Sequence, residues 1–208
     1  MKNRPSTEQA PSAAALWTNG WYRHARRLDS PNFGPRPDGA QIDLLVLHSI
    51  SLPPGEFGTG DVQRLFTNRL DWDAHPYFQK IRGLEVSAHF FIARNGDLWQ
   101  FVSCGDRAWH AGSSSYRGRE NCNDDSIGIE LEGLEGDRFE QTQYETLASL
   151  ASALMAAWPV RHIAGHEHIA PGRKIDPGPG FDWPRLKRSL AAPESFYPPS
   201  IRIDPRRV

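Results

Sequence analysis

The apolar positions of this chain fall into short runs that predict β-strands. Residues 42–48 (Ile-Asp-Leu-Leu-Val-Leu-His) are almost continuously apolar, as expected of a strand buried on both faces. Residues 86–93 form a second apolar run, and Asn95-Gly96 predicts a hairpin turn into a partner strand at 98–102. Residues 126–132 alternate, which predicts a strand with two different faces. One face would carry Ile127, Ile129 and Leu131, and the other Gly128, Glu130 and Glu132.

Two later segments are predicted to be helical. Thr142-Gln-Tyr-Glu145 fits a capping box, and apolar residues then recur at helical spacing until Pro159 ends the pattern. A second helix should begin near Asp182-Trp-Pro184, where an acidic cap precedes an early proline. A long loop is predicted at 49–60, after the first strand. Because strands and helices interleave, we predict an α/β or α+β fold around a mixed β-sheet.

Length and charge limit the classes of function. The 208 residues fit one domain, which we place at 16–192 between tails at 1–15 and 193–208. Lys and Arg number 24 against 25 Asp and Glu, so the net charge is −1. This balance gives no electrostatic reason to expect a nucleic acid or an acidic membrane as a partner.

Further features favour a cytoplasmic protein. The apolar run at 13–17 is too short for the core of a signal peptide, and no window approaches the ~18 apolar residues of a membrane span. Cys104 and Cys122 have neither the number of a disulfide framework nor the paired spacing of a zinc ribbon. We therefore expect two reduced thiols.

The segment 165–179 carries the candidate chemistry. It places His166, Lys174 and Asp176 within eleven residues, and its prolines and glycines predict a loop without helix or strand. An imidazole and a carboxylate offer Zn²⁺ two ligands, whereas catalytic zinc sites use three protein ligands and one open position. His48 is the best third ligand, because it ends a buried strand at the rim of the sheet. Taken alone, His48 also fits a hydrogen-bonded core histidine, and Asp176 a turn cap.

Glu130 is the second informative acid. Its side chain is either exposed on an open sheet face or held in a cleft that raises its pKa. In a zinc hydrolase, a carboxylate in such a cleft takes a proton from the metal-bound water. Lys174 would then stand near the oxyanion formed at the attacked carbonyl. A solvated strand residue is the favoured interpretation of Glu132, and the alternative for Glu130.

Five segments of the chain combine into a family resemblance. They are Val46–Gly58, Val86–His89, Arg107–Gly112, Ser126–Gly133 and Gly165–Pro179. In this order they closely resemble the AmpD family of 1,6-anhydro-N-acetylmuramyl-L-alanine amidases, over about Gly20 to Leu190. Five ordered motifs are far more specific than any single spacing.

The resemblance implies a fold, a cofactor and an activity. The fold would be a central mixed sheet flanked by helices, as in peptidoglycan-recognition proteins and T7-type lysozymes, with Zn²⁺ in a surface groove. The family's zinc ligands correspond to His48, His166 and Asp176, and its catalytic residues to Glu130 and Lys174. The implied reaction is hydrolysis of the amide between the lactyl group of anhydro-muramic acid and L-alanine. The substrate would be an anhydro-muropeptide recycled in the cytoplasm.

The resemblance also implies contacts with the substrate at Ser49, His89 and Trp109. A satisfied sheet residue is the alternative for His89, and an ordinary core aromatic is the alternative for Trp109. The indole of Trp109 would stack on the sugar or the peptide.

Two positions depart from the enterobacterial pattern, which has arginine at both. Glu85 and Asn121 stand there instead, and a glutamate cannot pair with a carboxylate of the stem peptide. We expect Arg117, Arg119 or Arg173 to take this role, or shorter peptides to be accepted.

Other classes of function differ from this one in testable features. A recognition module of the same fold would bind muropeptide without cutting it, and the loss of a zinc ligand would favour that function. In this sequence the three zinc-ligand positions and the two catalytic positions are all filled. An amidase acting on intact periplasmic peptidoglycan would need an export signal. A purely structural protein is disfavoured, because a buried Glu and Lys beside a ligand cluster would cost stability.

Overall fold

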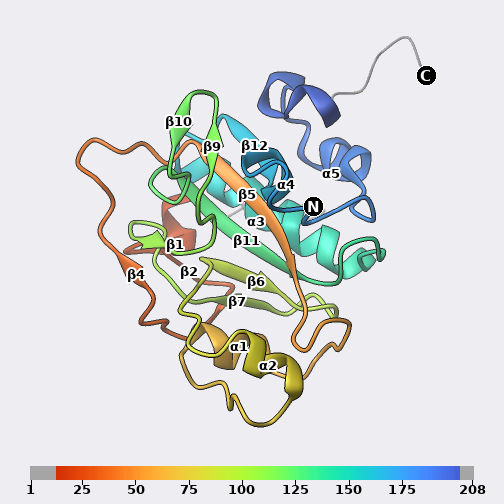
Figure 1. Ribbon diagram of the computed structural model, residues 1–208. Coiled ribbons are helices and arrows are strands. Elements are labelled where there is room, and N and C mark those ends of the chain that lie inside the picture. Colours follow the sequence, from red (N-terminus) through yellow and green to blue (C-terminus); the bar gives the residue numbers. More distant parts are fainter. Residues whose placement is uncertain (1–12, 202–208) are drawn as a thin grey trace, which may run out of the picture.

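The computed structural model describes residues 13–201, which are organised around a six-stranded mixed sheet (Figure 1). The strand order is β12-β5-β11-β6-β7-β3. The strands are β3 (Arg26–Arg27), β5 (Leu44–Ile50), β6 (Phe90–Ile92), β7 (Leu98–Gln100), β11 (Ser126–Glu132) and β12 (His162–Gly165). β5 runs parallel to both of its neighbours, β12 and β11, and β6 and β7 form an antiparallel hairpin. The predicted mixed sheet is confirmed.

The predicted strands differ from the observed ones mainly at 86–93, where pairing begins only at Phe90. The reason lies in the side chain of His89, whose Nδ1 accepts a hydrogen bond from Gly128 N at 3.0 Å. At His89 an imidazole thus takes the place of a backbone acceptor, and the regular ladder starts at Phe90, four residues after the predicted start. The strand at 126–132 has the predicted boundaries, and the strand predicted at 42–48 is observed at 44–50.

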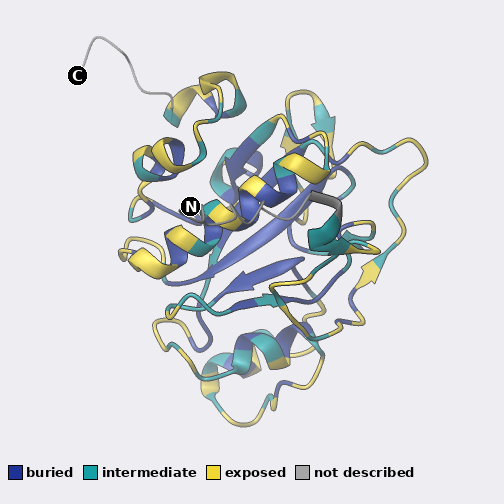
Figure 2. Cartoon of the chain, turned by 180° about the vertical axis from the view of Figure 1, so that it is seen from behind, coloured by how far each residue is buried: buried dark blue, intermediate teal, exposed yellow. Residues whose placement is uncertain are grey.

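The helix α3 (Gln141–Ala157) covers one face of the sheet (Figure 2). Its predicted end before Pro159 is confirmed, but its N-cap is Glu140, whose backbone N–H donates to the Gln143 side chain at 2.9 Å. Thr142, the predicted cap, instead donates its hydroxyl hydrogen to Arg94 O at 2.8 Å. Within residues 13–201, no helix is both long and apolar enough to cross a membrane.

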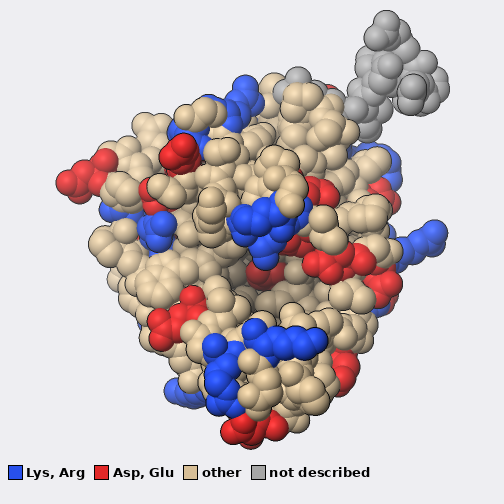
Figure 3. Space-filling model, viewed as in Figure 1, with Lys and Arg blue, Asp and Glu red and all other residues tan. Residues whose placement is uncertain are grey.

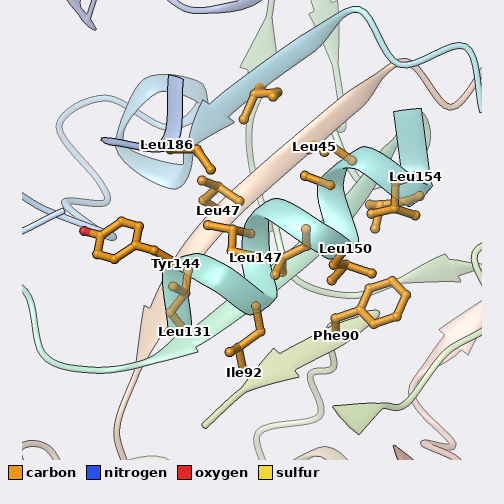
Figure 4. Packing of buried hydrophobic residues seen from close by; sticks show 14 of the residues in the cluster. Leu45, Leu47, Phe90, Ile92, Leu131, Tyr144, Leu147, Leu150, Leu154 and Leu186 are labelled. Atoms are coloured by element: carbon orange, nitrogen blue, oxygen red, sulfur yellow. The ribbon is translucent and has the colours of Figure 1, made fainter. Parts of the chain in front are cut away.

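The main core lies between α3 and the sheet (Figure 4). Leucines at helical spacing on α3 pack against alternate residues of β5, β6 and β11, and α5 (Trp183–Leu190) adds Leu186. The labelled members are Leu45, Leu47, Phe90, Ile92, Leu131, Tyr144, Leu147, Leu150, Leu154 and Leu186. Each fully buried side chain of this kind contributes about 1.5–3 kcal/mol. The start of α5 agrees with the prediction, because Asp182 Oδ1 accepts from Arg185 N at 2.9 Å.

The remaining elements are short. The helices are α1 (Asp61–Phe66), α2 (Pro76–Lys80) and α4 (His166–Ile169). Three two-stranded pairs are β1 (Trp17–Thr18) with β2 (Trp21–Tyr22), β4 (Phe33–Gly34) with β8 (Arg107–Ala108), and β9 (Ser115–Tyr116) with β10 (Arg119–Glu120). Single 3₁₀ turns occur at Ala13–Leu16, Glu194–Phe196 and Pro199–Ile201.

The chain around residue 193 packs against the domain, although the predicted C-terminal tail begins there. Tyr197 is fully buried, and Lys187 Nζ donates to Glu194 Oε2 at 2.8 Å. The ordered packing of 194–201 therefore continues that of α5. The other parts of the two predicted tails, 1–12 and 202–208, lie outside the described residues.

Candidate metal centre and active site

Three predicted ligands converge at the carboxyl ends of two neighbouring parallel strands. His48 lies near the end of β5, and His166 opens α4 directly after β12. Asp176 approaches them from the following loop. His48 Nδ1 is 2.9 Å from His166 Nδ1, and Asp176 Oδ2 is 3.1 Å from each of these nitrogens. The strand order places His48 and His166 side by side, because β12 pairs with β5.

The geometry of these atoms fits a zinc ion. The three separations are close to the roughly 3.3 Å expected between ligand atoms of a tetrahedral site with Zn–N distances near 2.0 Å. All three residues are buried, and each offers one ligand atom to the same point. Two nitrogens and one oxygen leave a fourth position open, which is the donor set of a catalytic zinc site. The cluster therefore can hold zinc between β5, α4 and the loop.

The segment 165–179 is not entirely a loop, as it was predicted to be. Residues 166–169 form the single turn α4, because the first proline and glycine after Gly165 come only at 171 and 172. The chain then turns back at Gly172, whose φ of +77° favours glycine. Glu167 N donates to Asp176 O at 2.9 Å, which closes the segment and brings Asp176 to His166.

Two of the ligands, His48 and Asp176, have perturbed pKa values. Burial, opposed by the hydrogen bond to Asp176 and assisted by the neighbouring His166, lowers the pKa of His48 to about 4, so the ring is neutral at pH 7. Burial acts to raise the pKa of Asp176, but hydrogen bonds with His166 and His48 outweigh it and lower the pKa overall. A neutral imidazole and an ionised carboxylate are the forms that bind a metal.

Glu130 lies on β11 directly opposite His48 in the parallel register. The carboxyl group is buried, and its Oε2 has no hydrogen-bond partner among the described residues. Burial raises its pKa well above 4.5, and the charge of Asp176 adds to this effect, while that of Lys174 opposes it. This is the cleft alternative of the sequence analysis, not the solvated strand residue.

Lys174 lies at the rim of the same cavity, and it is exposed. The argument that a buried lysine would cost stability therefore does not apply. Its positive charge still reaches the site, because it lowers the pKa of both His48 and Glu130.

A cavity of about 280 Å³ opens in front of the cluster. Figure 3 shows a hollow near the centre of this face, with acidic surface beside it and basic surface above and below. The polar wall is made by the cluster, Glu130 and Lys174, and the apolar wall by α1, α2 and the loop after β5. Its apolar lining includes Leu52, Leu65, Phe66, Tyr77, Ile81, Leu84 and Val86. The site thus presents an apolar surface opposite a reactive one.

Two of the predicted substrate contacts line this cavity. Ser49 Oγ is buried there and has no partner within residues 13–201. Trp109 is half-buried, and two hydrogen bonds with Ser87 hold its backbone: Trp109 N donates to Ser87 Oγ at 3.0 Å and Trp109 O accepts from Ser87 N at 3.1 Å.

The other two predicted contacts are placed elsewhere. His89 is fully buried, and besides Gly128 N it contacts Asp106 O at 3.1 Å through Nε2, so it is the satisfied sheet residue of the alternative interpretation. Arg119 binds both oxygens of Asp43, at 2.7 and 3.1 Å, and Asp125 at 3.0 Å. Asp43 precedes β5, at the end of that strand opposite to His48. The two carboxylates thus hold the guanidinium away from the cavity.

Glu132 is also buried, which corrects the expectation of a solvated residue. Its Oε1 accepts from Gly58 N at 2.6 Å, and its Oε2 accepts from Arg94 N at 3.0 Å. Because residues 51, 52 and 54 line the cavity, Glu132 anchors the loop that forms one wall.

His110 is a residue near the site that the sequence did not single out. It is buried in the cavity wall, and its Nδ1 is 3.0 Å from His48 Nε2. The available signal was Gly128, because a glycine inside a strand indicates a close approach. A Cβ at position 128 would stand 2.4 Å from His110 Cγ.

The sequence model of the family described as N-acetylmuramoyl-L-alanine amidase matches residues 38–179, more than half of the chain. The 1,6-anhydro-N-acetylmuramyl-L-alanine amidase AmpD of Citrobacter freundii is 51% identical over 182 residues, which cover 86% of this chain and 97% of that protein.

Solved structures agree with these sequence matches. A crystal structure of a selenomethionine AmpD derivative superposes with a TM-score of 0.82 at 50% identity, over 84% of this chain and 99% of that one. The amidase AmiD from E. coli, in complex with the substrate anhydro-N-acetylmuramic acid-L-Ala-D-γ-Glu-L-Lys, has a TM-score of 0.52 at 30% identity. This match covers 74% of this chain and 60% of the AmiD chain.

Proposed function

The chain belongs to the N-acetylmuramoyl-L-alanine amidase family, and we propose how its site performs the reaction of an AmpD-type enzyme. The enzyme hydrolyses the amide between the lactyl group of 1,6-anhydro-N-acetylmuramic acid and the L-alanine of a recycled muropeptide. His48, His166 and Asp176 would hold one zinc ion. When bound, zinc would act as a Lewis acid toward the scissile carbonyl and would lower the pKa of the attacking water.

Glu130 is the general base. Its side chain lines the cavity, and burial makes the carboxylate a stronger proton acceptor than an exposed glutamate. It takes a proton from the attacking water and then delivers it to the nitrogen of the leaving L-alanine. The charge of Lys174 opposes the rise in the pKa of Glu130 and so favours the ionised carboxylate.

Lys174 stabilises the negative charge that develops on the carbonyl oxygen. An exposed ammonium group at the rim can approach the substrate as it enters, and the filled cavity then excludes water from the charge pair. Trp109 offers a flat apolar surface for the sugar or the first peptide residues, and Ser49 offers an unpaired hydroxyl group.

We place this reaction in the cytoplasm. Cys104 and Cys122 are both buried and unpaired, which is typical of proteins in a reducing compartment. The single observation that carries the proposed mechanism is the triangle of His48 Nδ1, His166 Nδ1 and Asp176 Oδ2 beside the unpaired oxygen of Glu130.

Incubation with anhydro-muramyl-tripeptide, followed by mass spectrometry, tests this function. The zinc-loaded enzyme should release free tripeptide and anhydro-N-acetylmuramic acid, the chelated enzyme should release neither, and added zinc should restore both products. Intact substrate in the zinc-loaded sample would overturn the proposal and favour a module that only binds muropeptide.

A further inference from the structure

The two candidate histidine ligands are both held from behind by one dipeptide, His110-Ala111. The Nε2 atom of His48 is 3.0 Å from His110 Nδ1, and the Nε2 atom of His166 is 3.0 Å from Ala111 O. In each imidazole, therefore, one ring nitrogen faces the cluster and the other faces this dipeptide. The residues that contact the second nitrogen decide which nitrogen carries the proton.

The proton on His48 is assigned by a chain of hydrogen bonds. Ser126 donates its hydroxyl hydrogen to Cys122 O, so the Ser126 oxygen is left as an acceptor for His110 Nε2 at 3.2 Å. A neutral His110 that donates through Nε2 accepts through Nδ1. The buried ring is taken as neutral because neither of its nitrogens contacts a carboxylate within residues 13–201. His48 must then donate through Nε2, which leaves its Nδ1 lone pair directed at the cluster.

The proton on His166 is assigned more directly. A backbone carbonyl accepts hydrogen bonds but cannot donate them, so the 3.0 Å contact with Ala111 O favours a hydrogen on His166 Nε2. Arg173 Nη2, which could only donate to this nitrogen, lies farther away at 3.3 Å. The same carbonyl also accepts from Arg173 Nη2 at 2.6 Å. The Nδ1 atom of His166 therefore also carries a lone pair, and both rings present the form that binds a metal.

The dipeptide itself is clamped in place. Asn123 Oδ1 accepts from His110 N at 3.1 Å and from Ala111 N at 2.8 Å. Gly128 on β11 leaves the space that the His110 ring occupies. Asn123, Ser126 and His110 are all buried, so these contacts are shielded from exchange with water.

We propose that His110, Ser126 and Asn123 are positioning residues that orient both imidazole ligands and select their metal-binding tautomers. The proposal rests on the proposed function, because it assumes that the cluster holds zinc. None of the three residues contacts the reacting atoms; each acts through His48 or His166. Loss of such an outer partner typically weakens metal binding about 10- to 100-fold.

The first test is a matched pair of variants at position 110. His110→Leu fills a similar volume but accepts nothing from His48, whereas His110→Asn has an amide oxygen near the position of Nδ1. The dissociation constant for zinc is measured by competition with a chromophoric chelator, without any substrate. We expect binding to weaken about 10- to 100-fold in His110→Leu and far less in His110→Asn. The visible spectrum of the Co²⁺-loaded protein should change only in His110→Leu.

A second pair keeps the test decisive if His110→Leu does not fold. Asn123→Ala removes the acceptor for both backbone amides, and Asn123→Asp keeps it. Zinc binding should weaken in Asn123→Ala and recover in Asn123→Asp, while thermal unfolding of the metal-free proteins shows that both are folded. Unchanged zinc affinity in His110→Leu, or in a folded Asn123→Ala, would overturn the positioning role. If the unaltered protein itself binds no zinc, the proposed function fails as well.

Discussion

The two faces of strands β5 and β11 consist of alternate residues of the same segments, but they have different tasks. The face under α3 is apolar and fully buried, and it consists of Leu45, Leu47, Ile127, Ile129 and Leu131. The opposite face is also buried but carries polar groups or a glycine near the cavity, at His48, Gly128, Glu130 and Glu132. Each of the two strands therefore serves stability on one side and chemistry on the other.

The difference between the faces is one of compensation. Apolar burial is non-directional, so the α3 face needs only matching volumes. Polar burial is unfavourable without partners. His48 is compensated by His110 and the cluster, and Glu132 by two backbone amides, but Glu130 Oε2 has no partner within residues 13–201. We therefore expect the buried Glu130 carboxylate to lower the stability of the fold while serving the reaction.

The largest effect is expected on the polar face, where a substitution should lower the catalytic rate without lowering the stability of the protein. Glu130→Gln keeps the shape of the side chain but removes the proton acceptor, so the rate of tripeptide release should fall about 10²- to 10⁴-fold. The free energy of unfolding of the metal-free protein should stay equal or rise, because no carboxylate is buried. Glu135→Gln, an exposed acid at the same cavity, is the control and should keep its activity. A Glu130→Gln variant that hydrolyses substrate at the normal rate would exclude the base role.

A substitution on the α3 face should lower the free energy of unfolding without lowering the catalytic rate. Leu147 is fully buried in the main core, so Leu147→Ala should reduce the free energy of unfolding by about 2–5 kcal/mol. The rate per folded molecule should stay unchanged at low temperature. Urea unfolding and a rate assay measure the two quantities. Ile175→Ala, at a position that is 66% exposed, should change stability by less than about 0.5 kcal/mol.

Glu132 is an acid on the same polar face as Glu130, but both of its carboxylate oxygens accept a hydrogen bond from a backbone N–H group. Glu132→Gln would turn an amide group toward one of the two backbone N–H groups that Glu132 binds. We expect a loss of about 1–3 kcal/mol in unfolding free energy and a higher KM, because the loop at 51–60 loses an anchor. Glu145→Gln on the exposed side of α3 is the matched control. An unchanged KM together with reduced stability would show that Glu132 does not shape the substrate cavity.

The smallest expected effect is a dependence of stability on pH. The folded-state pKa of Glu130 is raised above 4.5, so the unfolded chain releases this proton first as the pH increases. The group therefore makes the metal-free protein less stable as the pH rises from about 4.5 towards the folded-state pKa. Urea unfolding at several pH values should show the unfolding free energies of wild type and Glu130→Gln diverging in this window. Parallel curves would contradict the raised pKa.

Local patterns predicted much of the fold. The strand at 126–132, the end of α3 before Pro159 and the start of α5 at Asp182 depend on periodicity, proline and capping, which are properties of neighbouring residues. The start of β6 and the N-cap of α3 were missed, because in each segment a side chain hydrogen-bonds to the backbone of a distant residue. His89 and Thr142 made those tertiary contacts.

The features of the candidate site also fall into those that local motifs predicted and those that depend on tertiary contacts. Ordered motifs were enough to select His48, His166, Asp176, Glu130 and Lys174. They did not reveal that Arg119 binds Asp43 and Asp125, or that Lys174 is exposed. Charge pairing and exposure depend on which surfaces meet after folding.

The sequence alone predicted β5, β6, β7 and β11 but not β3 or β12, and α3 and α5 but not α1, α2 or α4. It also showed which residue types are available for zinc chemistry. These are properties of spacing and side-chain type along the chain. Folding alone decides that Glu130 Oε2 has no partner within residues 13–201, that Glu132 anchors a loop and that His110 supports His48 across 62 positions. The reason is physical: the directions of lone pairs and the hydration of a carboxylate are set by atoms that become neighbours only when the chain is folded.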